Sequence, residues 1–173
     1  APDLAELLER YRAERGGTVP QVAESVRVLS DMFNGVTPHR PGYLAQLPLR
    51  RAYAQYYLPV NAEKVARILR EMDAYATRPA QPRLLDFGCG PGTASIAYLL
   101  ERGPAELTLV DVVDEALDDA AWFCRALGAE PRLLHALPEY EKFDFIFAAH
   151  VDSQQQPALE NLLADGGYLV VVE

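Results

Sequence analysis

A short stretch near the middle of the sequence combines an acid, three glycines at alternate positions and a hydroxyl residue. Asp86 ends an apolar run, and Gly88, Gly90 and Gly92 follow it before Thr93. This order is typical of a strand, a tight turn and the start of a helix. Glycines let the backbone approach a ligand closely, and a helix start offers unpaired N–H groups and a partial positive charge. We therefore predict that this turn binds a nucleotide-like ligand.

The spacing of the glycines excludes two common nucleotide sites. The dinucleotide fingerprint needs its third glycine three residues after the second, where this sequence has Thr93. The Walker pattern needs a Lys followed by Ser or Thr at the end of the loop, and no such pair follows Gly92. The remaining alternative to a binding loop is a strand-to-helix turn that binds nothing.

The pattern of acid, any residue, and three alternating glycines resembles motif I of the class I S-adenosylmethionine-dependent methyltransferases, whose four fixed positions are all matched here. The resemblance implies that Asp86 helps to hold the amino group of the cofactor. It also implies that the loop, with Cys89 and Thr93, wraps the methionine and ribose portions. Adenosylmethionine carries a sulfonium, an ammonium and a carboxylate, so a carboxylate beside backbone N–H groups complements both signs.

Further cofactor contacts are expected where the next strands end. Asp111 ends the second predicted strand, twenty-three residues after Gly88, and ligands of an open parallel sheet lie at this edge. In the methyltransferases an acid here accepts hydrogen bonds from the ribose hydroxyls, so we assign Asp111 and the following Val112 to the cofactor; a helix cap or a solvated acid is the alternative. After the third strand the family often presents an acid to adenine, whereas this chain has Ala136, whose contact would come from the backbone.

His150, at the end of the fourth predicted strand, is the candidate catalytic residue. This position faces the methyl group in the family, and an imidazole can act as a general base or orient a substrate; a purely structural histidine is the alternative. The Asn-Pro-Pro-aromatic and Pro-Cys signatures of two methyltransferase classes are absent, and neither Cys89 nor Cys124 suits catalysis. Because methyl transfer is an in-line displacement that chiefly needs positioning, activity does not require a larger catalytic set.

The elements that must position these residues alternate in the second half of the chain. We predict strands at 83–87, 106–111, 132–135, 143–149 and 167–172, and helices at 92–101, 114–127 and 157–163. The mostly apolar strands imply burial on both faces, so the fold class is α/β with a Rossmann-like, doubly wound parallel sheet. The chain stops at Glu173, so we expect the sheet to be incomplete after its fifth strand.

The first half of the chain is predicted to be helical. Amphipathic patterns favour helices at 3–14, 21–33, 49–57 and 62–75, with a loop at 37–42 and a Pro-rich linker at 77–82. Pro59 is expected to break the run of helix, and Asn61 to cap the next one. These patterns divide the chain into a helical module at 1–80, a lid or substrate platform, and a cofactor-binding domain at 81–173.

Charge is unevenly divided between the two halves. Residues 1–83 hold twelve Lys or Arg against nine Asp or Glu, whereas residues 84–173 hold four against sixteen. Any RNA contact would therefore come from the first half. Arg50 and Arg51 are interleaved with Tyr53, Tyr56 and Tyr57, a pattern that can hold phosphates and stack on bases, although tyrosines at this spacing also serve as packing residues.

A narrower resemblance covers about residues 40–115. It is to the methyltransferase-like family associated with the small ribosomal subunit, known in mitochondria and in bacteria, and it rests on residues 56–61, Lys64, Val65, Ile68, Leu69 and 84–95. Membership would imply rRNA or the small subunit as partner, through the N-terminal helices. The family's cysteine cluster for an iron–sulfur centre is not present in these 173 residues. The alternatives are a non-catalytic assembly factor that keeps the cofactor pocket and a small-molecule methyltransferase.

Composition predicts a soluble, cytoplasmic protein. No apolar run approaches the ~20 residues that span a bilayer, and no signal segment opens the sequence. The first residue is Ala, from which we expect a processed or trimmed N-terminus. The two cysteines fit a reducing compartment and are too few for a disulfide framework or a four-cysteine metal site.

Overall fold

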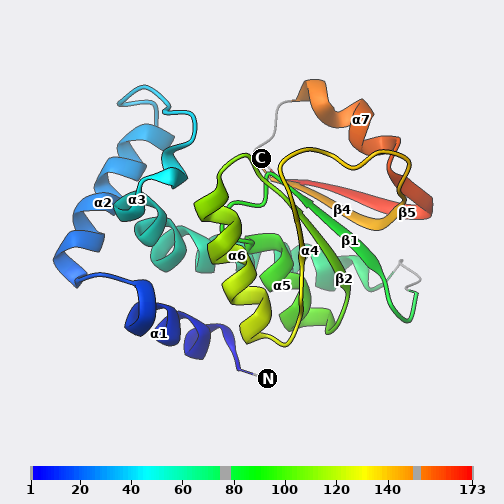
Figure 1. Ribbon diagram of the computed structural model, residues 1–173, viewed down its shortest axis with the longest axis horizontal. Coiled ribbons are helices and arrows are strands. Elements are labelled where there is room, and N and C mark those ends of the chain that lie inside the picture. The colour runs from blue at the N-terminus through cyan, green and yellow to red at the C-terminus, as the bar shows by residue number, and fades with distance from the viewer. Residues whose placement is uncertain (1, 75–78, 150–152, 173) are drawn as a thin grey trace.

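The computed structural model describes residues 2–74, 79–149 and 153–172 (Figure 1). Its centre is a five-stranded parallel sheet of order β3-β2-β1-β4-β5. The strands are β1 (Arg83–Phe87), β2 (Glu106–Val110), β3 (Arg132–Leu134), β4 (Phe143–Ala149) and β5 (Leu163–Val172). The α/β class and the parallel sheet are therefore confirmed. The chain moves outward from β1 to β3 and then returns to β4 on the other side of β1, so the strand order reverses between β1 and β4.

Helices cover both faces of the sheet. They are α4 (Leu58–Met72), α5 (Thr93–Arg102), α6 (Asp114–Ala126) and α7 (Gln156–Glu160). The first three share one core with Leu84 and Phe147, and α7 packs on the opposite face near Leu85 and Ile146. Neighbouring residues of one strand thus face different cores, which explains why the strands are apolar throughout. No helix in the described parts of the chain is long and apolar enough to cross a membrane.

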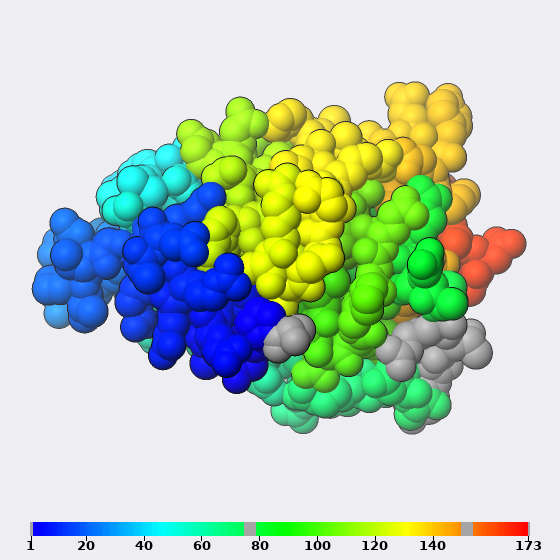
Figure 2. Space-filling view, turned by 60° about the horizontal axis from the view of Figure 1, so that its bottom comes forward, coloured from blue at the N-terminus to red at the C-terminus, as the bar shows by residue number. Residues whose placement is uncertain are grey.

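The N-terminal elements are α1 (Leu4–Arg15), α2 (Val19–Phe33), the 3₁₀ turn η1 (Tyr43–Ala45) and α3 (Leu47–Ala52). α1 and η1 lie against the helical layer of the sheet, whereas α2 packs on α3. In α1, Tyr11 stacks on Phe123 of α6 with ring centroids 5.0 Å apart, and Figure 2 shows the blue α1 against the yellow-green α6. α4 buries Val65 and Leu69 in the core of the sheet itself. The division at residue 80 stays a prediction.

The helical run from α3 into α4 is continuous. Its joint, η2 (Tyr53–Tyr57), is a π-helical turn in which the N–H of Leu58 donates to the carbonyl of Tyr53. Pro59 lies in the first turn of α4, so our predictions that it breaks the helix and that Asn61 caps the next one were wrong. The wider turn explains the exception, because in a regular α-helix a proline ring clashes with the carbonyl four residues earlier.

The predicted start of α6 at residue 114 is confirmed, and Val113 occupies its cap position without a side-chain hydrogen bond. Two boundaries nearer the C-terminus were wrong. The predicted helix at 157–163 ends at Glu160, and β5 begins at Leu163 with a shift in its register against β4. Gly167 lies in this irregular part of β5, where an added Cβ would come within 3.0 Å of the carbonyl oxygen of Phe143. β5 therefore begins before residue 167, where the apolar pattern predicted its start.

Candidate functional site

The glycine-rich turn after β1 has the backbone that its sequence predicts. Gly88, Gly90 and Gly92 all have positive φ, at 65°, 51° and 85°, in the region that L side chains rarely adopt. The N–H groups of Gly88 and Cys89 donate to the carbonyl of Val110 at 2.8 and 3.1 Å. These bonds fix the turn across the end of β2, and Gly92 then caps α5.

Asp86 is a buried carboxylate at the end of β1, only 1% exposed. Its Oδ2 accepts hydrogen bonds from the backbone N–H and the hydroxyl of Ser95, at 3.0 and 2.7 Å. Burial raises the pKa of Asp86 to about 6, the charge of Asp111 adds to the rise, and the two bonds from Ser95 oppose it. An ionised carboxylate in such a place favours a positively charged ligand group.

Asp111 joins the turn to the end of β2. Its two oxygens accept from the N–H groups of Gly90 and Val113 at 2.8 and 2.9 Å, and each oxygen keeps capacity for a further donor. Val112 beside it is 82% exposed, which offers an apolar surface to a flat ring. Ala136 is also exposed, after β3, and His135 approaches the carbonyl of Asp111 at 3.3 Å.

A short turn of the N-terminal part, η1, covers the glycine turn. Leu44 of η1 is buried with Val113 and Ala116. An added Cβ on Gly90 would lie 3.3 Å from Leu44 Cδ1. Glycine at this position therefore permits the close approach of the Leu44 side chain as well as a left-handed backbone. No local pattern marks Leu44, because the contact joins segments far apart in the chain.

A small polar cluster, formed by Tyr53, Asn61 and Thr93, lies where α5 begins. Asn61 Nδ2 donates to the Tyr53 hydroxyl at 3.5 Å. Burial raises the pKa of Tyr53, and the facing hydroxyl of Thr93 and the amide of Asn61 oppose the rise. Although Thr93 faces Tyr53, the geometry completes no hydrogen bond, and Thr93 Oγ1 is buried without a partner. Sequence reasoning assigned Thr93 to the site and missed Tyr53 and Asn61.

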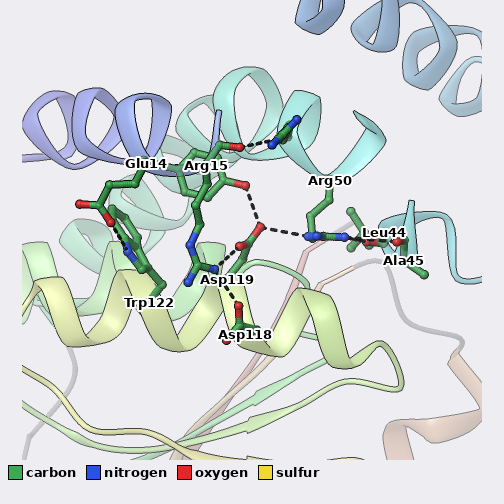
Figure 3. Close-up of polar contacts among 10 residues, drawn as sticks. Glu14, Arg15, Leu44, Ala45, Arg50, Asp118, Asp119 and Trp122 are labelled. Carbon is green, nitrogen blue, oxygen red and sulfur yellow. Dashed lines mark hydrogen bonds and ion pairs between the residues drawn. The ribbon is translucent and has the colours of Figure 1, made fainter. Parts of the chain in front are cut away.

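Asp119 of α6 holds the N-terminal helices in place (Figure 3). It accepts from the Tyr11 hydroxyl at 2.7 Å, from Arg15 at 2.7 Å and from Arg50 Nε at 3.2 Å. Arg50 also donates to the Leu44 carbonyl at 2.9 Å, which connects Asp119 to the cover of the turn.

Arg50 and Arg51 are turned towards protein groups. Arg50 is 9% exposed, and Arg51 Nε donates to the Arg15 carbonyl. Tyr53 and Tyr57 stack on one another with centroids 5.8 Å apart, whereas Tyr56 is 53% exposed. Apart from Tyr56, the Arg and Tyr residues of this helix therefore pack within the molecule.

Three residues considered in the sequence analysis remain: His150, Cys89 and Cys124. His150, the candidate catalytic residue, lies outside the described residues. Cys89 and Cys124 are buried free thiols, and burial raises the pKa of both, in Cys124 to about 12. Such thiols are poor nucleophiles, in keeping with the prediction that neither is catalytic.

A hollow of about 250 Å³ lies away from the strand ends, between α1 and α6. Its lining is Arg10, Arg15, Asp118, Trp122, Arg125 and Ala126. Two of its arginines are paired with acids, Arg15 with Asp118 and Arg125 with Glu130, both within 2.7 Å. Neighbouring acids therefore neutralise most of the positive charge on the arginines that line the hollow.

Comparison with solved structures places this geometry among known folds. A methyltransferase from Clostridium acetobutylicum, dependent on S-adenosylmethionine, aligns with a TM-score of 0.54 and 23% identity, over 69% of this chain and 53% of its own. A candidate O-methyltransferase from Nostoc punctiforme aligns with a TM-score of 0.58 and 18% identity, over 88% and 50%. The fold is that of the S-adenosylmethionine-dependent methyltransferases. A further S-adenosylmethionine-dependent methyltransferase, from Thiobacillus denitrificans and solved with S-adenosyl-L-homocysteine, aligns with a TM-score of 0.51 and 20% identity, over 65% of this chain and 47% of its own.

Sequence comparison gives a shorter match. No known protein-family profile matches this sequence. The biotin biosynthesis bifunctional protein BioCD of Bordetella avium is 40% identical over 55 residues, which are 32% of this chain and 12% of that protein. This chain spans about half the length of the solved structures that it matches.

Proposed function

We propose that this chain is an S-adenosylmethionine-binding methyltransferase domain. The observation that carries the proposal is the glycine turn, whose three left-handed glycines lie between the carboxylates of Asp86 and Asp111. The turn follows β1, one of the two strands between which the strand order reverses. Ligands of open parallel sheets bind at this point. The Thr93 hydroxyl, which is buried without a protein partner, is available to a polar group of a ligand at this site.

The residues predicted at the ends of the strands each have a role in this proposal. Asp86 faces the ammonium of the cofactor, Asp111 accepts from its ribose hydroxyls, and Val112 and Ala136 border the adenine. The bound cofactor supplies an activated methyl group on sulfur. The chain's part is to bind and orient it, and to exclude water with the Leu44 cover, since an in-line displacement depends on alignment. His150 keeps its proposed role as a base or a substrate-orienting group.

For the methyl acceptor we propose RNA, with ribosomal RNA as the first substrate to test. The excess of basic residues before residue 84 and the exposed Tyr56 support this proposal. Arg50 and Arg51 do not, because they are used within the molecule. The cytoplasm remains the proposed compartment.

A small-molecule acceptor is the second candidate. It is favoured by the aromatic cluster that lies near the covered turn, in which Phe33, Tyr43, Tyr53 and Tyr57 have successive ring centroids 5.0 to 6.5 Å apart. Such a cluster, next to the Leu44 cover, suits a compact apolar or aromatic acceptor.

Calorimetry with S-adenosylhomocysteine tests the cofactor proposal. Wild-type protein should bind, and Asp111→Ala should weaken binding at least about 10-fold by removing the acceptor for the ribose. Asp114→Ala is the matched control, because Asp114 lies three residues on and its side chain is 82% exposed. The proposal fails if wild-type protein gives no binding heat.

Transfer of a labelled methyl group then separates the acceptors. Label should move to rRNA or small subunits if the acceptor is RNA, and to a low-molecular-weight fraction if it is a small molecule. Binding to subunits without any transfer of label would instead identify a non-catalytic assembly factor.

A further inference from the structure

The polar cluster of Tyr53, Asn61 and Thr93 joins two parts of the chain at the start of α5. Tyr53 comes from the π-helical turn η2 and Asn61 from α4, whereas Thr93 is the first residue of α5. Asn61 donates to the Tyr53 hydroxyl at 3.5 Å, a long bond that leaves both groups able to serve another partner.

The hydroxyl of Thr93 is the group in this cluster that lacks a partner. Thr93 is 9% exposed, and its Oγ1 makes no hydrogen bond although Tyr53 faces it. Buried hydroxyls are nearly always paired, so an unpaired one beside a candidate binding site points to a ligand atom that completes it.

The charges around the cluster favour a carboxylate next to an ammonium. Thr93 Oγ1, Asn61 Nδ2 and the Tyr53 hydroxyl can all donate hydrogen bonds. They lie at the N-terminus of the ten-residue helix α5, where the helix dipole favours negative charge. Asp86, whose charge acts on Tyr53, supplies the opposite sign close by. A donor cluster beside a carboxylate complements the zwitterion of an α-amino acid.

We propose that Tyr53, Asn61 and Thr93 bind the carboxylate of the cofactor's amino-acid end, while Asp86 binds its ammonium. This inference rests on the proposed function. It makes the N-terminal helices part of the cofactor site, and it gives the π-helical turn a purpose, because η2 presents Tyr53 to α5 while Tyr56 stays 53% exposed.

Two ligands distinguish this role from a structural one. S-Adenosylhomocysteine carries the amino-acid end, and 5′-methylthioadenosine is the same nucleoside thioether without it. Tyr53→Phe, Asn61→Ala and Thr93→Val should each weaken S-adenosylhomocysteine about 10- to 100-fold, and should change the affinity for methylthioadenosine less than about twofold. Tyr56→Phe, on the same turn, is the matched control and should change neither affinity.

Thermal unfolding of each variant shows whether it is folded. Thr93→Val is nearly isosteric and removes a buried unpartnered hydroxyl, so its unfolding midpoint should not fall. The inference is overturned if the variants weaken both ligands equally, or if they leave S-adenosylhomocysteine unaffected while wild-type protein binds it. If wild-type protein binds neither ligand, the proposed function itself fails.

Discussion

The hydroxyl of Tyr11 donates a 2.7 Å hydrogen bond to Oδ2 of Asp119, which links the first helix of the chain to a helix that packs on the sheet. Burial and the neighbouring charge of Asp119 raise the pKa of Tyr11, so this hydroxyl stays a donor at physiological pH. The same oxygen accepts from Arg50, whose other end holds the carbonyl of Leu44. One carboxylate thus positions α1, α3 and the cover over Gly90.

Replacing Asp119 should destabilise the protein strongly. In Asp119→Ala the guanidinium of Arg50 and the hydroxyl of Tyr11 stay buried without their acceptor. Breaking a buried ion pair from one side costs about 3–5 kcal/mol, and urea unfolding should show a loss of this size in the free energy of unfolding.

Asp118→Ala is the control for this prediction. Asp118 also bonds Arg15 at 2.7 Å, but its side chain is 68% exposed, so the loss should stay below about 1 kcal/mol. Similar losses in the two variants would contradict the positioning role given to Asp119.

Gly90→Ala should weaken binding of S-adenosylhomocysteine more than the same change at Gly35. Both glycines have positive φ, 51° and 71°, so both variants carry the left-handed strain of about 1 kcal/mol. At Gly35 no atom lies within 4 Å of an added Cβ, whereas at Gly90 Leu44 Cδ1 lies 3.3 Å away. We expect only Gly90→Ala to weaken S-adenosylhomocysteine in calorimetry, and equal binding by both variants would show that the close approach is unimportant.

Asp86→Asn should stabilise the protein at neutral pH. Burial raises the pKa of Asp86 from 3.8 to about 6. The contribution of this carboxyl to the free energy of unfolding is therefore fully present below pH 4, where the group is protonated, and is lost as the pH rises through 6. The amide oxygen of Asn can still accept from Ser95. The free energy of unfolding of the variant minus that of wild type should therefore grow by about 2–3 kcal/mol from pH 4 to pH 7.

Denaturant unfolding of both proteins across this pH range gives the difference directly, because other titrating groups cancel. A difference that does not change with pH would contradict the raised pKa of Asp86. The same variant should bind S-adenosylhomocysteine poorly at pH 7, since it no longer offers a charge to the ammonium.

Both thiols should resist alkylation in the folded protein. Cys89 is 6% exposed and Cys124 is fully buried, and burial raises the pKa of each. Iodoacetamide at pH 8 should modify neither in native protein and both in guanidinium, as mass spectrometry would show. Rapid native modification of Cys89 would mean that the turn opens readily.

Local sequence signals predicted the parts of the site that one segment builds. The turn after β1 needed three left-handed residues, and only glycine adopts that backbone cheaply. Asp86 and Asp111 followed from their places at the ends of two strands, because carboxyl ends of parallel strands share one edge of a sheet. The prediction from Pro59 was wrong: we expected a break in the helix there. A pattern of residue types does not reveal the π-helical turn that accommodates this proline.

By itself the sequence determined the parallel sheet, the glycine turn and its two acids, because strand periodicity and backbone preferences act over a few residues. Only the tertiary structure decided that Arg50 turns inward to Asp119, that Leu44 covers Gly90, and that Tyr53 faces Thr93. Each of these contacts joins residues 30 or more positions apart. Their partners are set by how helices pack on the sheet, and packing depends on the whole chain.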